Sequence, residues 1–234
     1  MAKIAIDAGH GRYTPGKRCP YKLDKNETRE WVLNDRVADW VETFLEMAGH
    51  EVIRIDNPTG ETDVSLSART TKANLQSIEC YVSIHHNAGA DLTSAGGTVV
   101  YRYPGTTGKT VELQEAVYKR AVEYGDLPGN RWDGTQEANF QVLRETRMSA
   151  VLIECGFMDS TTDIKYILDP AWSKKMARGI AQGICDVYGG TIKEPVENKE
   201  DKLYRVQVGA YSKKANAEKM LESLKNAGYD AYIK

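Results

Sequence analysis

The chain has 234 residues and a mass of 26.1 kDa, which corresponds to roughly one and a half domains of typical size. Hydrophobic residues make up 41% and charged residues 27%, so disorder, collagen-like repeats and a coiled coil are excluded. With 31 basic and 33 acidic residues the net charge is -2, which gives no positive field to grip a phosphate backbone. Nucleic acid is therefore not expected as a partner.

The apolar pattern predicts alternating strands and helices along most of the chain. It predicts, in order, a strand over 3–7, a helix over 30–48, a strand over 51–55, a helix over 65–75, strands over 80–84 and 98–102, a helix over 109–124, a strand over 151–154 and a helix over 171–188. This alternation is typical of an α/β fold with a mostly parallel, twisted sheet flanked by helices.

The composition turns polar after residue 189, and residues 190–202 offer almost nothing to bury. We interpret them as a linker between a main domain, 1–189, and a tail, 203–234. In the tail we expect a strand over 203–210, a helix over 215–227 and a strand over 229–233. The tail is thus predicted to be a small β-α-β half-module, too small to bury a core by itself.

No run approaches the roughly 20 apolar residues that a membrane span requires, and no signal peptide precedes the first strand pattern. We therefore expect no membrane span and synthesis in the cytoplasm. The four cysteines are widely spaced and form no CxxC pair, so they are predicted to be reduced thiols.

Residues suited to metal chemistry follow three predicted strands. His10 and His85 stand just beyond strand ends and Glu154 ends a third strand, so the three are expected at one edge of the sheet. Glu30, at the start of the first long helix, can return to the same edge. Two imidazoles and a carboxylate form the donor set of hydrolytic zinc sites, and a further carboxylate nearby serves as the base. The residues alone leave open a second interpretation, in which these are hydrogen-bonded surface side chains and Glu30 is a helix-start acid.

Six motifs occur in order over residues 3 to about 188. They are Asp7-Ala8-Gly9-His10-Gly11, Glu30-Trp31-Val32-Leu33-Asn34, Leu66-Ser67-Ala68-Arg69-Thr70-Thr71-Lys72-Ala73-Asn74, Ser83-Ile84-His85-His86-Asn87-Ala88, Asn139-Phe140-Gln141-Val142-Leu143-Arg144 and Val151-Leu152-Ile153-Glu154-Cys155-Gly156-Phe157. Together they resemble the zinc-dependent N-acetylmuramoyl-L-alanine amidases of the third amidase family. The resemblance is closest to sporulation autolysins and phage endolysins of Gram-positive bacteria.

The resemblance implies a role for each matching residue. It implies that His10, Glu30 and His85 bind zinc and that Glu154 is the catalytic acid/base. Glu27 competes with Glu30 for the ligand position, but the length of helix that follows Glu30 fits the family better.

Four further residues lie in or beside the motifs. Asn87 and Arg144 are expected near the cleft as substrate-binding residues, with Arg144 contacting substrate carbonyls. His86 falls where the family varies and is interpreted as a pocket-wall or solvent residue. Cys155 has no histidine placed to form a Cys-His pair, so a thiol nucleophile is not expected.

The sequence departs from the family in two places. Gly11-Arg12-Tyr13-Thr14-Pro15-Gly16 replaces the common Gly-Gly-x-Asp-Pro-Gly, and Ser149 replaces a proline. These changes bear on the shape of the substrate groove and hence on which peptide stems are accepted.

The tail resembles the sporulation-related repeat, a module that binds cell-wall glycan, through Tyr204–Ser212 and Asn216-Ala217-Glu218. The usual module consists of two β-α-β halves, and this sequence shows one. We hypothesise that two chains pair their tails in a homodimer; the alternative is that the half-module packs on its own catalytic domain.

The resemblance implies a peptidoglycan hydrolase that cleaves the amide between N-acetylmuramic acid and L-alanine. Without an export signal, such an enzyme would reach the wall after release through a holin-type pore or by lysis of the producing cell. Two alternatives stay open: a zinc peptidase that acts on stem peptides, and a wall-binding protein without activity.

Overall fold

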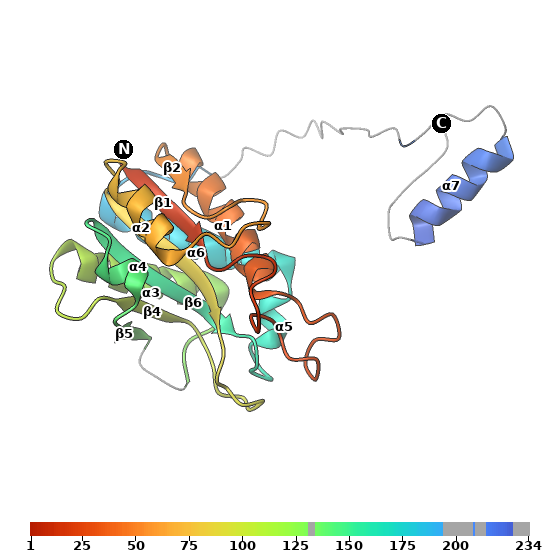
Figure 1. The fold of residues 1–234 in the computed structure, drawn as a ribbon, viewed down its shortest axis with the longest axis horizontal. Coiled ribbons are helices and arrows are strands. Elements are labelled where there is room, and N and C mark those ends of the chain that lie inside the picture. The colour runs from red at the N-terminus through yellow and green to blue at the C-terminus, as the bar shows by residue number, and fades with distance from the viewer. Residues whose placement is uncertain (131–133, 194–207, 209–213, 227–234) are drawn as a thin grey trace. The chain divides into compact units, whose positions relative to one another are not determined.

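A central sheet organises the main part of the chain (Figure 1). In the computed structural model, which describes residues 1–130, 134–193, 208 and 214–226, this sheet has six strands in the order β2-β1-β3-β6-β4-β5. The strands are β1 (Lys3–Ala8), β2 (Glu51–Arg54), β3 (Cys80–Asn87), β4 (Val99–Arg102), β5 (Thr135–Glu137) and β6 (Ser149–Phe157). All neighbouring pairs are parallel except β4 and β6, which are antiparallel. The predicted α/β class with a mostly parallel sheet is confirmed.

Helices cover both faces of this sheet. They are α1 (Glu30–Met47), α2 (Leu66–Asn74), α3 (Lys109–Gly125), α4 (Gln141–Arg144), α5 (Ile164–Ile167) and α6 (Pro170–Tyr188). Helices α1, α3 and α6 pack over one face, where Ile4, Ile6 and Val82 join the larger core. Helices α2 and α4 lie over the other face, on a smaller core that includes Ala5 and Tyr81. Alternate residues of a strand therefore enter different cores, as the twofold side-chain period of a strand requires.

Two details differ from the sequence-based expectations. Strands β3 and β6 run on to Asn87 and Phe157, so His85 and Glu154 lie within strands and not at their ends. The apolar pattern also did not predict β5, α4 and α5, which have three or four residues each. Elements this short have too few residues to display a period.

The chain divides into two compact units, Met1–Glu194 and Pro195–Lys234. In the second unit the expected helix is present as α7 (Lys214–Asn226), which has no buried side chain. The two strands expected in the tail, over 203–210 and 229–233, lie outside the described residues except for Val208.

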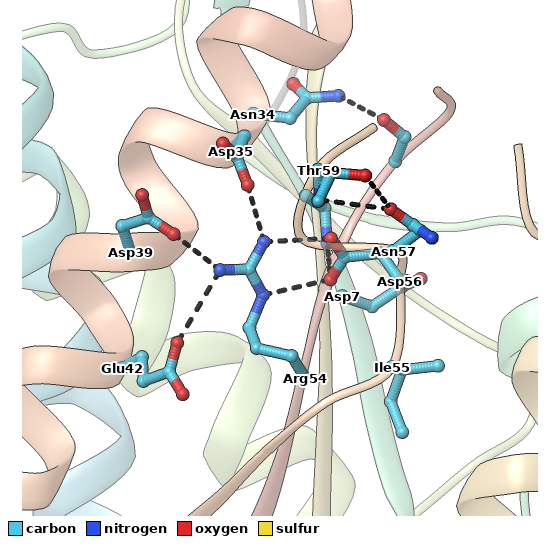
Figure 2. A network of polar contacts seen from close by, with 12 residues as sticks. Asp7, Asn34, Asp35, Asp39, Glu42, Arg54, Ile55, Asp56, Asn57 and Thr59 are labelled. Carbon is cyan, nitrogen blue, oxygen red and sulfur yellow. Dashed lines mark hydrogen bonds and ion pairs between the residues drawn. The ribbon is translucent and has the colours of Figure 1, made fainter. Parts of the chain in front are cut away.

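Arg54, at the end of β2, ties α1 to the sheet (Figure 2). Its side chain is 8% exposed and forms ion pairs with four carboxylates. Asp35, Asp39 and Glu42 come from α1, at 2.7, 2.6 and 3.6 Å, and Asp56 follows β2, at 2.8 Å. The Asp56 side chain is fully buried. The Arg54 guanidinium neutralises its negative charge, which the protein interior would otherwise disfavour.

We expect Arg54→Met to destabilise the protein by about 3 kcal/mol, because removing one partner of a buried ion pair leaves an uncompensated charge. Urea unfolding measures this loss. Arg147→Met, at an exposed position, is the matched control and should change the free energy of unfolding by less than about 0.5 kcal/mol. Equal effects of the two substitutions would contradict a bracing role for Arg54.

Candidate active site

Three side chains predicted to bind a metal meet beside the sheet. Glu30 Oε2 lies 3.3 Å from His10 Nε2, and Glu30 Oε1 lies 3.1 Å from His85 Nδ1. One nitrogen or oxygen atom from each residue falls within 4.8 Å of the others. The two imidazole rings are perpendicular, with centroids 5.0 Å apart. The structure therefore brings together the predicted set from β3, from the turn after β1 and from the first turn of α1.

The turn after β1 presents His10 in an unusual backbone conformation. Its φ is +67°, which non-glycine residues rarely adopt. The Arg69 guanidinium, only 2% exposed, holds this turn by donating to the carbonyls of Ala8 and His10 at 2.8 and 2.9 Å. Arg69 also pairs with the buried Asp7 carboxylate, which accepts a hydrogen bond from the Tyr81 hydroxyl at 2.6 Å. A buried ionic network thus fixes the direction of the His10 side chain.

Gly9 makes room for the His85 imidazole. A Cβ atom at Gly9 would lie 2.1 Å from Cε1 of His85, a distance that real contacts do not reach. Only glycine leaves room here for the His85 side chain of β3. The glycine of the motif is therefore needed for packing against this strand as well as for the turn.

The Glu30 carboxylate is held at the start of α1 by both its backbone and a helical neighbour. Its backbone N–H donates to the carbonyl of Lys17 at 3.0 Å, and its side chain is 2% exposed. Asn34, one turn later, donates to Glu30 Oε1 at 3.4 Å and to the carbonyl of Gly9 at 3.1 Å. Asn34 lies in the motif that begins at Glu30, and its i+4 spacing, which puts both residues on one helix face, is the sequence signal for this positioning role.

The electrostatics of Glu30 favour a bound cation. Burial acts to raise its pKa, but the His10 and His85 imidazoles outweigh burial and hold the pKa of Glu30 well below its usual range. Glu30 Oε2 is buried and has no hydrogen-bond donor among the described residues. The Lys17 ammonium, 3.7 Å away, lies beyond hydrogen-bond distance, so a buried, ionised oxygen of this kind would be stabilised further by a metal ion bound directly to it. Two imidazoles and one carboxylate are the donors that hydrolytic zinc sites use, so these residues fit zinc.

Glu154 lies next to this set. It is the register partner of His85 across β3 and β6, so both side chains emerge on the same face of the sheet. Glu154 Oε2 is buried and has no hydrogen-bond partner in the described part of the chain. Burial, with the negative charge of Glu30 as a second cause, raises the pKa of Glu154 well above its usual range. A carboxyl group with a raised pKa is suited to take up and return a proton near neutral pH.

A pocket of about 370 Å³ opens over these groups. Glu30, His85 and Glu154 line it together with Asn87, which the sequence analysis expected near the cleft. Arg144 is not among the lining residues: it is exposed on α4, and its guanidinium donates to Asn139.

Glu27, the competitor for the ligand position, pairs with Arg18 at 3.3 Å and is not part of the histidine cluster. His86 is 2% exposed, so a solvent role is wrong, while the pocket-wall interpretation agrees with its place in the lining. Its Nδ1 lies 2.8 Å from Asn34 Oδ1, and burial lowers the pKa of His86 to about 3. Burial raises the pKa of the Cys155 thiol, which keeps it a thiol and not a nucleophilic thiolate.

Fold and site together define an α/β protein with the donor set of a metal hydrolase. A family model described as N-acetylmuramoyl-L-alanine amidase matches residues 4–186, and a second model, the SPOR domain, matches residues 183–234. The chain belongs to the N-acetylmuramoyl-L-alanine amidase family. The resemblance to this family noted in the sequence is thereby confirmed. Among the described residues, no helix combines the length and the apolar composition that crossing a membrane demands.

Curated relatives and solved structures agree with this assignment. An N-acetylmuramoyl-L-alanine amidase of Bacillus licheniformis is 32% identical over 235 residues, covering 100% of this chain and 85% of the relative. A sporulation-specific amidase of Bacillus subtilis is 31% identical, covering 100% and 84%. The crystal structure of an N-acetylmuramoyl-L-alanine amidase from Clostridium difficile is 30% identical with a TM-score of 0.71, covering 79% of this chain and 95% of that chain.

We expect Gly9→Ala to weaken metal binding roughly 10- to 100-fold, because the added methyl group displaces the His85 ring from its position beside Glu30. Competition with a zinc chelator measures this change. In the control Gly105→Ala the new Cβ meets nothing within 4 Å, and although alanine is strained at this residue's φ of +76°, zinc affinity should stay at the wild-type value. Unchanged zinc affinity in Gly9→Ala would contradict the packing role assigned to this glycine.

Proposed function

We propose that this amidase hydrolyses the bond between the lactyl group of N-acetylmuramic acid and L-alanine, using zinc held by His10, Glu30 and His85. The observation that supports this most directly is the buried Glu30 carboxylate: its two oxygens each face one imidazole, and Oε2 accepts no hydrogen bond from the described residues. The family and its relatives supply the substrate class, peptidoglycan.

In this mechanism the side chains of the protein hold the metal-binding residues in position and transfer the proton. When bound, zinc supplies Lewis-acid activation of water and of the amide carbonyl. Glu154 takes a proton from the attacking water and delivers it to the leaving alanine nitrogen, so the C–N bond breaks as a neutral amine forms. Asn34 and Arg69 keep Glu30 and His10 in position throughout. Asn87, on the pocket wall, is proposed to contact substrate, whereas the exposed position of Arg144 gives no support to such a role.

The proposed role in the cell is lysis of the wall during sporulation. A 31% identical relative is a sporulation-specific amidase, which favours this role over that of a phage endolysin. The SPOR match supports peptidoglycan binding by the tail. A catalytic domain over 1–189, a linker over 190–202 and a wall-binding tail over 203–234 form the proposed organisation. Tail pairing in a homodimer and release by a holin or by cell lysis stay predictions, and sedimentation of the full chain tests the first.

Mass spectrometry of digested peptidoglycan tests the bond specificity. We expect the zinc-loaded protein to release stem peptides with a free N-terminal alanine, and Glu154→Gln to reduce this release at least about 10³-fold while zinc content stays the same. The loss follows because an amide cannot accept the proton of the attacking water. Cuts within the stem peptide would instead establish the zinc peptidase, and absence of zinc and of all products would establish a wall-binding protein.

In the metal-free protein, the ionised Glu154 carboxylate should lower the free energy of unfolding at neutral pH. The pKa of Glu154 is raised in the folded protein. Below its unfolded-state pKa of about 4.3, Glu154 is protonated in both states and does not lower stability. As the pH rises through the folded-state pKa, folding has to bury a charged carboxylate and that stability is lost. We therefore expect metal-free Glu154→Gln to be more stable than the wild type by at least about 1 kcal/mol at pH 7.5. The difference should vanish below about pH 4. Urea unfolding at both pH values measures it, and a variant less stable at pH 7.5 would contradict the assignment.

A further inference from the structure

A lysine enters the pocket from the loop in which the sequence departs from its family. Pro15, Gly16, Lys17 and Arg18 line the pocket on the side of this loop. The Lys17 ammonium lies 3.7 Å from Glu30 Oε2, and its side chain is 46% exposed. Its positive charge also acts on Glu154, another lining residue, whose pKa it lowers against the larger effect of burial.

Lys17 is held in place by backbone contacts. Its carbonyl accepts the hydrogen bond from the N–H of Glu30, which caps α1 in place of a side-chain cap. Arg18 and Arg29 form an antiparallel bridge, and the N–H of Cys19 donates to the carbonyl of Thr28 at 2.9 Å. The loop is therefore pinned to the first turn of α1, so the Lys17 ammonium approaches the same region of the pocket as the Glu30 carboxylate.

The charges around the pocket leave Lys17 without a permanent partner. Arg18 is paired with Glu27, whereas Glu30 is the only ion-pair partner of Lys17 among the described residues. A metal ion bound by Glu30, His10 and His85 would neutralise the negative charge of Glu30, which would then no longer pair with Lys17. Glu154, the other acidic residue of the pocket lining, forms no ion pair with Lys17 in the described structure. The Lys17 ammonium would then face the open pocket, and a partly desolvated ammonium favours an anionic ligand.

We propose that Lys17 is a specificity-determining residue that binds a free carboxylate of the stem peptide close to the scissile amide. The inference rests on the proposed function and adds a substrate preference to it. Stem peptides occur with carboxyl groups that are free or converted to carboxamides, and a carboxamide has no charge to pair with an ammonium. The enzyme therefore prefers muramoyl peptides with the free carboxylate next to the alanine that is released.

The test compares two soluble muramoyl dipeptides, one with a free carboxylate on the second amino acid and one with the carboxamide, on the zinc-loaded full chain. We expect the wild type to prefer the carboxylate by about tenfold in kcat/KM, as one charge-assisted contact supplies. Lys17→Gln should reduce this ratio to about one, through a higher KM for the carboxylate substrate. Lys17→Glu should invert the ratio, because a second anion repels the carboxylate.

Two controls separate the proposal from other roles of Lys17. Lys22→Gln removes the same charge from the same loop at an exposed position outside the pocket lining, and it should keep the tenfold ratio. Chelator competition should give Lys17→Gln a zinc affinity within about threefold of the wild type. A ratio that survives in Lys17→Gln, or equal losses on both substrates, overturns the proposal. If the wild type releases alanine peptide from neither substrate, the proposed function itself fails and this inference falls with it.

Discussion

The buried carboxylate of Glu30 is the constraint on which the rest of the site depends. An ionised oxygen at 2% exposure is unfavourable unless donors or a cation surround it. The chain places His10 beside one oxygen and His85 beside the other, and Oε2 accepts no hydrogen bond from any residue in the described ranges. Most of the neighbouring structure can be understood as holding these three side chains together before any metal arrives.

Each of the three is held by a different part of the fold. The first turn of α1 is held by its bridge to the Lys17 loop, and the middle of the same helix by the ion pairs of Arg54. The Arg69 network fixes the strained His10 turn, and Gly9 provides the space that His85 occupies. Arg54, Arg69 and Gly9 are not among the residues that line the pocket, so they prepare the site through packing and ion pairs within the scaffold.

Glu154 differs from the residues that hold the site together, because its position destabilises the protein. Its Oε2 is buried near the Glu30 carboxylate and has no hydrogen-bond partner among the described residues, which lowers stability at neutral pH but gives the raised pKa that proton transfer requires. Sites of this kind are expected where function and stability conflict.

Sequence patterns predicted the α/β class and the long elements, because buried strands and amphipathic helices have clear periods. Ordered motifs, and not spacing alone, singled out His10, Glu30, His85 and Glu154. The sequence could not show that β3 and β6 continue past the site residues, since polar residues within a strand break its apolar pattern. Long-range partners such as Arg69 with Asp7 were also missed, because a buried ion pair leaves no local signature.

The most direct test of the metal centre is calorimetric titration of zinc into chelator-stripped full-length protein, with wild type and Glu30→Gln compared. We expect one tightly bound zinc per wild-type chain, and an affinity at least about 100-fold weaker when the buried carboxylate becomes an amide. Equal zinc affinity in the two proteins, or no binding by the wild type, would rule out a zinc centre built on Glu30.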